Sequence, residues 1–578
     1  MNTMRLLFSM AAGLALCCAP SAWAALGIQP PVAGGGAPGA TPIAAGTEIV
    51  NLLSNAVNGS TYQLGAGNFP VTATQVRTNT AVNGNPGFTT AINLWNKTNI
   101  TILGVPGKTI INASQGFDTR TSLGQVLFMT NCMDIVIRDV TFKGQHLTNY
   151  TIFTNEWLWA GVTIYNCKNI TLENCNIIDH FDQGIEDDAW RFGYGPHSTN
   201  IVIRGGLIEN CGSQRTNIIN AGDGAGIVPT GWTIDGVTFR DNWRHIEPYD
   251  ELDGYPFTTL AIRNCLFEGS IDSGIYTAGS TNGHSMLIEN NRILQPRDYT
   301  RRGTNQYQTA SGIHINAGQS PRIINNYVRG YVVGANITTA LDMWGLQLLN
   351  NFFEFQSNSA VASYAIQIGD TGVTLPKVRQ ATIANNTIRG SQWFSMYLFG
   401  LGDSVVRDNH FWDPITTGGF DVVALAGNST CNSNVLFQGN SFVELGTVDS
   451  DAAFSIQSGV RLRFVDNFIT GMTTNYHNTI GDEVSISGPI RNYSFTVDLP
   501  SVTGGGNFVT NFTATGVRTN DLVNIMIPSQ GWTSGNTTNI TWTYWPSNDA
   551  IFLQFQAIQT GNPQNIRVRA VAQQVEAY

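Results

Sequence analysis

Charged side chains are scarce in this chain. Lys, Arg, Asp and Glu make up 12% of its 578 residues, about half of their usual share in globular proteins. The formal net charge is −10 and no basic stripe offsets the acids, so we do not expect nucleic acid as a partner. Apolar runs of membrane-spanning length are also missing, and we expect no membrane span.

The N-terminus has the pattern of an export signal. Arg5 is followed by the short apolar run Leu6–Leu16, and Ala22-Trp23-Ala24 fits a small-residue cleavage site. We expect residues 1–24 to be a signal peptide and the protein to be secreted, either extracellular or periplasmic.

Cysteine is rare beyond the signal peptide. Six cysteines in more than 500 residues do not make a disulfide scaffold, although export would permit disulfides. Cys132 and Cys167 share a register one repeat apart and are the pair placed to cross-link. Cys175 and Cys265 fall in an apolar column of the repeat and are expected to be core thiols.

What the chain has in abundance is glycine, 61 residues, and a loose repeat of the form apolar-x-[Asn/Asp/Gly]-x-x-apolar. Asn, Asp and Gly are the residues that tolerate a left-handed backbone, so this position predicts a fixed corner of a coil. The spacing between corners varies from 23 to 35 residues, as expected if loops of different length leave stacked coils. The predicted corners are Gly104, Asp139, Asn174, Gly205, Gly236, Asn264, Asn290, Asn325, Asn350, Asn385, Asp408, Gly439 and Asp466.

The residue after the corner is small or apolar in most early repeats and always asparagine in the later ones. Seven asparagines at one register predict a ladder in which each side-chain amide bonds to the coils above and below. The ladder residues are Asn291, Asn326, Asn351, Asn386, Asn409, Asn440 and Asn467.

This pattern resembles the right-handed parallel β-helix of the pectate-lyase-like superfamily, over about Asn51 to Gly471, with the asparagine column as its most specific element. The resemblance implies an all-β fold: a right-handed parallel β-helix solenoid of about 13 coils, with an N-terminal capping helix. It specifies architecture and leaves function open.

The solenoid is expected to have neighbours on both sides in the chain. Residues 25–46 read as a Gly/Pro/Ala linker, and residues 47–480 as the β-helix. Thr47 to Val57 predicts its capping helix, with Thr47 as the cap. Residues 490–578 alternate in polarity and predict a small β-sandwich for binding, capping or oligomerisation, which would make a homo-oligomer through this domain conceivable.

A second strand follows each corner and usually opens with a small residue and then an apolar one. Because side chains alternate along a strand, the residues after the isoleucines should form one outward column. That column would hold Glu186, Val228, Glu247, Tyr276, His314, Asn336, Gln367 and Tyr397. Asp188 and Asn316 fall in a second column, two residues on. Asp187 would point inward on a continued strand, so we expect the strand to end before it.

These columns supply the candidate catalytic residues, Glu186, Asp188, Glu247 and His314. Glu186 and Glu247 should lie two coils apart, roughly 9–10 Å before the side chains bend. Inverting glycosidases hold an acid and a base about 6.5–9.5 Å apart to admit a water. The alternative is that exposed acids simply keep the solenoid soluble.

Aromatic and basic residues near these acids predict contacts to a polysaccharide, since flat rings offer apolar faces to sugar rings. The arginines would instead pair with Asp250 or Glu251 if they have no role in binding. The candidate substrate-binding residues are Trp190, Arg244, Tyr249, Tyr276, Arg301 and Asn316.

No cofactor is expected, and no protein metal site is predicted. Asp182, Glu186, Asp187 and Asp188 are the only grouping that suggests Ca²⁺, and they lack the spacing of an EF-hand loop.

Three functions fit the sequence. The first is a secreted glycoside hydrolase with one carboxyl as general acid and another as general base. The resemblance extends to the Asp-Asp pair of the polygalacturonase-like branch, at Asp187-Asp188, but that branch's His-Gly and Arg-x-Lys motifs have no counterpart here. The second is a non-catalytic surface or adhesion protein. The third is a lyase or epimerase of a uronate polymer, with Arg244, Tyr276 and His314 as candidate groups.

Overall fold

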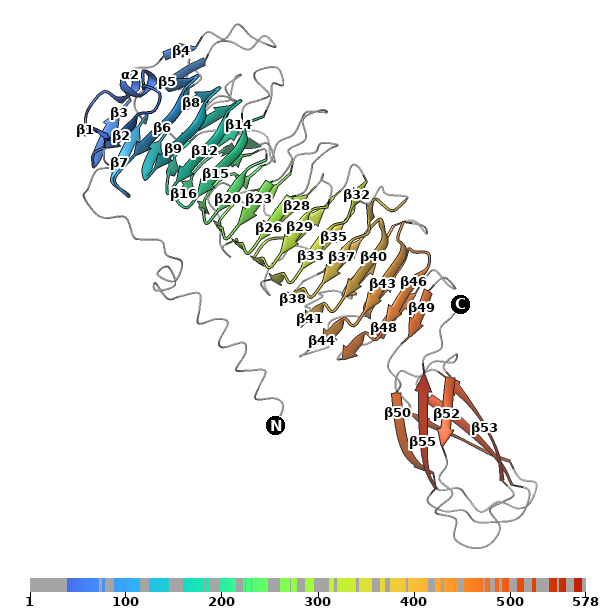
Figure 1. Cartoon of the computed structure of the whole chain (residues 1–578). Coiled ribbons are helices and arrows are strands. Elements are labelled where there is room, and N and C mark those ends of the chain that lie inside the picture. Colours follow the sequence, from blue (N-terminus) through green and yellow to red (C-terminus); the bar gives the residue numbers. More distant parts are fainter. Residues whose placement is uncertain are drawn as a thin grey trace.

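The protein forms a solenoid of parallel β-strands, seen in a computed structural model (Figure 1). From residue 474 onward, and in short stretches elsewhere, the backbone alone is described. The structure describes residues 39–71, 75–77, 88–114, 124–144, 160–180, 183–187, 197–214, 222–223, 225–229, 231–247, 260–270, 272–277, 286–295, 311–315, 320–338, 342–355, 364–369, 375–390, 393–413, 421–427, 431–444, 452–470, 474–478, 484–487, 491–497, 507–513, 522–526, 540–547, 550–557 and 566–573.

Three sheets, here called A, B and C, run the length of the solenoid. Sheet A consists of β1 (Thr41–Ile43), β2 (Thr61–Leu64), β6 (Thr98–Leu103), β9 (Met133–Arg138), β12 (Lys168–Glu173), β15 (Thr199–Arg204), β20 (Thr233–Asp235), β23 (Leu260–Arg263), β26 (Met286–Glu289), β29 (Arg322–Ile324), β32 (Met343–Trp344), β33 (Gln347–Leu349), β36 (Val378–Arg379), β37 (Thr382–Ala384), β40 (Leu401–Arg407), β43 (Ser433–Gln438), β46 (Leu462–Val465) and β49 (Val484–Ser487).

Sheet B has one strand for each coil. It consists of β3 (Gly67–Pro70), β7 (Thr109–Asn112), β10 (Val140–Lys143), β13 (Asn176–Ile178), β16 (Leu207–Glu209), β21 (Thr238–Arg240), β24 (Leu266–Glu268), β27 (Arg292–Leu294), β30 (Tyr327–Arg329), β34 (Phe352–Glu354), β38 (Thr387–Arg389), β41 (His410–Trp412), β44 (Ser441–Val443) and β47 (Phe468–Thr470).

Sheet C carries the predicted site. It consists of β4 (Gln75–Arg77), β5 (Phe88–Trp95), β8 (Gly124–Thr130), β11 (Val162–Tyr165), β14 (Ile185–Asp187), β19 (Ala225–Val228), β22 (Arg244–Ile246), β25 (Ile275–Tyr276), β28 (Ser311–Ile315), β31 (Val333–Ile337), β35 (Tyr364–Ile368), β39 (Phe394–Leu398), β42 (Val423–Leu425), β45 (Ala452–Ile456) and β48 (Thr474–Asn478). Apart from β4, which is antiparallel to β5, these strands pair in parallel.

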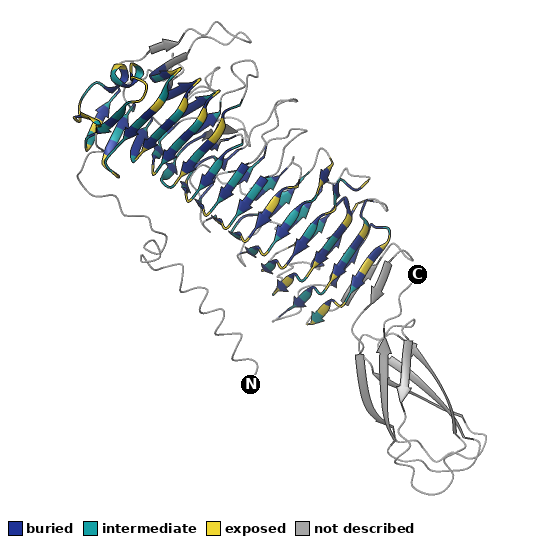
Figure 2. Ribbon diagram, in the orientation of Figure 1, coloured by how far each residue is buried: buried dark blue, intermediate teal, exposed yellow. Residues whose placement is uncertain are grey.

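The predicted β-helix is therefore confirmed. Its parallel strands extend from Thr41 to Ser487, slightly beyond the predicted 47–480. A short antiparallel pair, β17 (Ser213–Gln214) and β18 (Gly222–Asp223), leaves the coils. Buried residues alternate with partly buried and exposed ones along most strands, so one face of each strand fills a continuous core (Figure 2).

The capping helix is shorter than predicted and begins one residue later. Helix α2 spans Ile49–Ser54, and the carboxylate of Glu48, not the hydroxyl of Thr47, accepts from the first free N–H groups, those of Val50 and Asn51. The Thr47 hydroxyl instead donates to the Ala44 carbonyl. A carboxylate reaches two amides at once, which explains why Glu48 takes the position.

The corner prediction is correct at every position except Gly104. Each of the other twelve corners has φ between 51° and 68°, the left-handed region that Asn, Asp and Gly tolerate best. Replacing Gly206, which follows a corner, would place a Cβ 2.0 Å from the Cys175 carbonyl oxygen, so the coil spacing there requires glycine.

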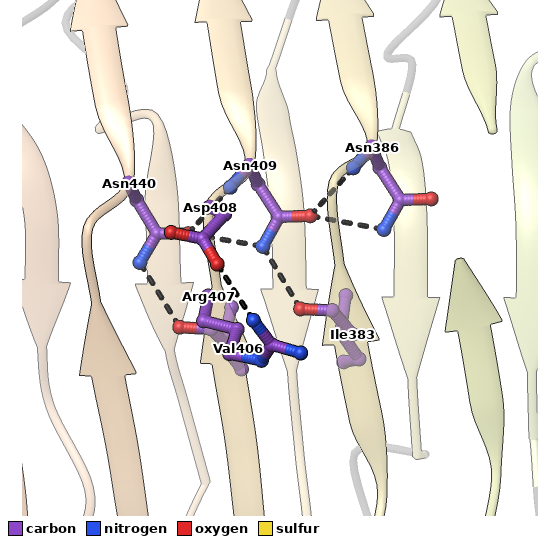
Figure 3. A network of polar contacts seen from close by, with 7 residues as sticks. All are labelled: Ile383, Asn386, Val406, Arg407, Asp408, Asn409 and Asn440. Carbon is purple, nitrogen blue, oxygen red and sulfur yellow. Dashed lines mark hydrogen bonds and ion pairs between the residues drawn. The ribbon is translucent and has the colours of Figure 1, made fainter. Parts of the chain in front are cut away.

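The asparagine ladder is also confirmed (Figure 3). The Asn409 side-chain oxygen accepts from both the backbone N–H and the side-chain amide of Asn386, at 3.0 and 2.9 Å. The Asn409 amide donates in turn to Asn440 and to the Ile383 carbonyl. All seven ladder residues are buried, so these bonds satisfy polar groups that water does not reach.

The six cysteines in the described part of the chain are buried thiols. Cys132 and Cys167 do not form the disulfide that their register suggested; the backbone N–H of Cys132 donates to the Cys167 sulfur at 3.4 Å. Cys175 and Cys265 are core residues, as expected, and burial raises the pKa of each thiol to about 12.

The C-terminal strands form two antiparallel sheets of three. These are β50 (Arg491–Val497), β55 (Ile566–Gln573) and β52 (Leu522–Met526) in one, and β51 (Asn507–Thr513), β54 (Ala550–Ala557) and β53 (Ile540–Ser547) in the other. All six strands lie within residues 490–578, where the sequence alternates in polarity.

Candidate functional site

The outward column of sheet C has the register that the sequence predicts. In the strand pairing of sheet C, Glu186 lies beside Val228, Tyr276 beside His314, and His314 beside Asn336. The isoleucines beside them point into the core and are at most 1% exposed; they are Ile185, Ile227, Ile246, Ile275, Ile313 and Ile366. Residues far apart in the chain are thus neighbours on one outer face.

Glu186 lies at the centre of β14 and is 5% exposed. Its Oε1 atom accepts from the Thr163 hydroxyl at 2.9 Å and from the Gln125 amide at 3.4 Å. Thr163 is its register partner on β11. These hydrogen bonds solvate a carboxyl group that water barely reaches.

Glu247 follows β22 and is 7% exposed. Its carboxylate bonds to the Nη1 atom of Arg244, three residues earlier. The Arg244 Nε atom bonds to Asp272 Oδ2 at 2.6 Å, so one guanidinium joins two carboxylates from successive coils. Burial lowers the pKa of Arg244, but Glu247 and Asp272 outweigh it and hold that pKa above its ordinary range.

Tyr276 and His314 continue this cluster. The Arg244 Cζ atom is 4.1 Å from the centroid of the Tyr276 ring, a cation–π contact. The rings of Tyr276 and His314 meet edge to face, with centroids 4.8 Å apart. Burial raises the pKa of the Tyr276 phenol, and although Arg244 lowers it, Glu247 and Asp272 add to the rise.

His314 is neutral at neutral pH. Burial lowers its pKa to about 4, more strongly than Asp272 raises it, and Arg244 lowers it further. Its Nε2 atom is 2.7 Å from the Thr338 hydroxyl. An imidazole in this state can accept a proton at pH 7 but has none to spare as a general acid.

Two predictions about these acids need correction. Glu186 and Glu247 share the outward face, but they are buried by their hydrogen-bond and ion-pair partners and not openly exposed. Asp187 is the last residue of β14, and its side chain is fully buried. The Ser198 N–H donates to it at 3.1 Å and His197 lies 3.9 Å away, which makes the burial tolerable.

The remaining site predictions concern residues outside the described part of the chain. These are Asp188, Trp190, Tyr249, Arg301 and Asn316, together with Asp182 of the calcium suggestion. Among the residues that are described, no group of three or more His, Cys, Asp or Glu is placed to hold a metal ion. Within that same part, no helix is both long and apolar enough to cross a membrane.

Sequence reasoning missed Asp272, the second carboxylate on Arg244. A signal was present, since Asp272 stands three residues before Ile275, the first residue of a sheet C strand. The Asp272 N–H donates to the Trp243 carbonyl, which aligns it beside Arg244 in the preceding coil. The outward column contains only residues that follow the isoleucine, whereas Asp272 precedes it.

Comparison with known proteins bears on the fold. Residues 311–480 match the family described as "Right handed beta helix region". This covers less than half of the chain, and together with the three parallel sheets it establishes the right-handed parallel β-helix. No curated protein sequence matches the chain.

Solved structures with a similar course of the chain include phage tailspikes. The tailspike of Pseudomonas phage phi297 is 12% identical, with a TM-score of 0.29, over 89% of this chain and 67% of that one. The tailspike of E. coli bacteriophage HK620, in complex with a pentasaccharide, is 12% identical with a TM-score of 0.42, over 91% and 88%. At these values no functional conclusion follows from the likeness.

Proposed function

We propose that the protein is a secreted polysaccharide-degrading enzyme, a glycoside hydrolase whose acid and base are Glu186 and Glu247. The observation that carries the proposal is their common column: the ladder β14–β19–β22 separates them by two strand spacings, about 9–10 Å. That is the upper end of the separation that inverting hydrolysis uses.

Their partners suggest how the two carboxyl groups divide the work. The Arg244 cation beside Glu247 favours the ionised carboxylate, the form that a general base requires. Glu247 would take a proton from water as the water oxygen attacks the anomeric carbon. Glu186 would donate its proton to the departing glycosidic oxygen, so that one water is consumed for each bond broken.

Release of reducing ends tests this function. Wild-type protein and Glu247→Gln would be incubated with dextran, galactomannan, arabinoxylan, polygalacturonate, alginate and bacterial lipopolysaccharide. Glu268→Gln is the matched control, because Glu268 is also paired with an arginine, Arg240, but lies on sheet B. Reducing ends should appear with at least one substrate, persist in the control and disappear in Glu247→Gln.

One observation favours a second candidate, a uronate lyase. Neutral His314 and the Tyr276 phenol lie beside Arg244, and a lyase needs a base near a cation that neutralises the substrate carboxylate. Against it, Arg244 already has two carboxylate partners. New unsaturated ends, read as ultraviolet absorbance with polygalacturonate or alginate, would favour the lyase. Glycan binding without either reaction would favour a non-catalytic surface protein.

A further inference from the structure

The outer face of sheet C changes character beyond the candidate site. Strands β14 and β22 carry acidic and basic residues, whereas the next strands after β28 have none. The sequences of β31, β35 and β39 are VGANI, YAIQI and FSMYL, without a single charged residue. A ligand along these coils therefore meets no fixed charge from the strands themselves.

Aromatic rings collect on this uncharged part. We call Tyr364, Trp393, Phe394 and Tyr397 the aromatic surface. Tyr364 and Phe394 stack with centroids 6.2 Å apart, and Phe394 and Tyr397 with centroids 4.9 Å apart. Trp393 meets Tyr364 edge to face at 6.0 Å and is 36% exposed. The other three rings are half-buried. Rings held by their neighbours present flat apolar faces at little cost in side-chain entropy.

The aromatic surface continues the column that holds the carboxylates. From Glu247 the column runs through Tyr276, His314, Asn336 and Gln367 to Tyr397. Five strand spacings separate Glu247 from Tyr397, about 24 Å. Asn336 and Gln367 are half-buried amides between the two ends, and amides are suited to bonding sugar hydroxyls.

We propose that the aromatic surface is a remote subsite for an uncharged stretch of polysaccharide, whose sugar rings rest on Tyr364, Trp393 and Tyr397. This proposal rests on the proposed function, because that function implies that the bound polysaccharide runs from the carboxylates toward β39. Ring faces next to amide groups match a pyranose, which has apolar C–H faces and an equator of hydroxyls. An anionic polymer is disfavoured because these strands supply no cation.

Affinity electrophoresis tests the subsite with the full chain. Native gels would contain dextran, galactomannan or arabinoxylan as neutral probes and polygalacturonate as the anionic probe. The variants are Trp393→Ala, Tyr397→Ala and Tyr397→Phe. Trp344→Ala is the matched control, since Trp344 is 44% exposed but lies on sheet A, and light scattering would follow the oligomeric state.

A neutral glycan should retard the wild type, Trp344→Ala and Tyr397→Phe alike. Trp393→Ala and Tyr397→Ala should bind about fivefold or more weakly. The subsite is refuted if no neutral glycan retards the wild type, if only polygalacturonate does, or if Trp393→Ala alters oligomeric state and not retardation. If a neutral glycan retards Glu247→Gln but the wild type hydrolyses no glycan, the hydrolase proposal is refuted and the subsite proposal stands.

Discussion

Arg244 and Asp272 come from successive coils and form an ion pair across two neighbouring coils of sheet C, with 2.6 Å between Arg244 Nε and Asp272 Oδ2. The same guanidinium also pairs with Glu247. This arrangement makes the site an electrostatic unit. Removing any one of the three charges changes the electrostatic environment of the other two.

Replacing Glu247 with Gln should lower hydrolysis at least about 100-fold, because a general base contributes roughly 10²–10⁴ to the rate. The side chain keeps its shape and still reaches Arg244. Initial rates on the substrate found by the reducing-end screen measure the effect. An unchanged rate, with Glu268→Gln as active as the wild type, would remove Glu247 from the mechanism.

Replacing Arg244 with Met should destabilise the fold by about 3 kcal/mol, since two largely buried carboxylates lose their cation. Urea unfolding at pH 7 measures the loss. The control is Arg240→Met, which breaks a more exposed pair on sheet B and should cost about 1 kcal/mol or less.

His314 should make the protein less stable in acid. Its folded pKa of about 4 lies below the unfolded value near 6.5, so the unfolded chain binds the proton first. Its contribution to stability is therefore complete above pH 6.5 and falls as the pH drops toward 4. His314→Gln should flatten the profile in this window when unfolding is followed from pH 7 to 4.

The matched control is His410→Gln, which replaces an exposed histidine on sheet B. Histidine titration by NMR offers an independent reading. A His314 resonance that titrates near pH 6.5 would contradict the burial on which this prediction depends.

Asn409→Ala should destabilise the solenoid by about 3–5 kcal/mol. It removes the acceptor of the Asn386 backbone N–H and side-chain amide and the side-chain donor to the Ile383 carbonyl, all of them buried, and each lost partner costs about 1–3 kcal/mol before relaxation. The Asn440 oxygen keeps the backbone N–H of residue 409 as a donor. Asp408→Asn, at the adjacent exposed corner, should change stability by less than about 0.5 kcal/mol. Equal effects of the two replacements would argue against the ladder as a stabilising element.

Much of the fold follows from local chemistry. The corners could be predicted because few residue types accept a left-handed backbone, and the column because strands alternate their faces. Equivalent positions of the repeat stack in one column, so the sequence alone aligns Glu186 with Glu247. Burial could not be predicted, because it depends on which partners reach across coils, as Thr163 reaches Glu186 and Asp272 reaches Arg244.

The aromatic surface shows the same limit. The spacing predicts Tyr397 in the outward column, but Tyr364, Trp393 and Phe394 precede the small-apolar pair and fall outside that column. Their approach to one another depends on ring orientation, which sequence spacing does not specify. Likewise, Thr47 suits a helix start by residue type, but Glu48 takes that position because its carboxylate reaches two backbone amides.

The asparagine ladder has a consequence for how such a molecule changes in length. Every rung from Asn291 to Asn467 offers its predecessor an oxygen and its successor a donor pair, so any two rungs are interchangeable partners. A whole turn could be removed or duplicated within this stretch and the cut ends would still match. The second half of the solenoid therefore consists of coils with equivalent contacts to their neighbours. The half that carries the carboxylates has small or apolar residues in place of these asparagines.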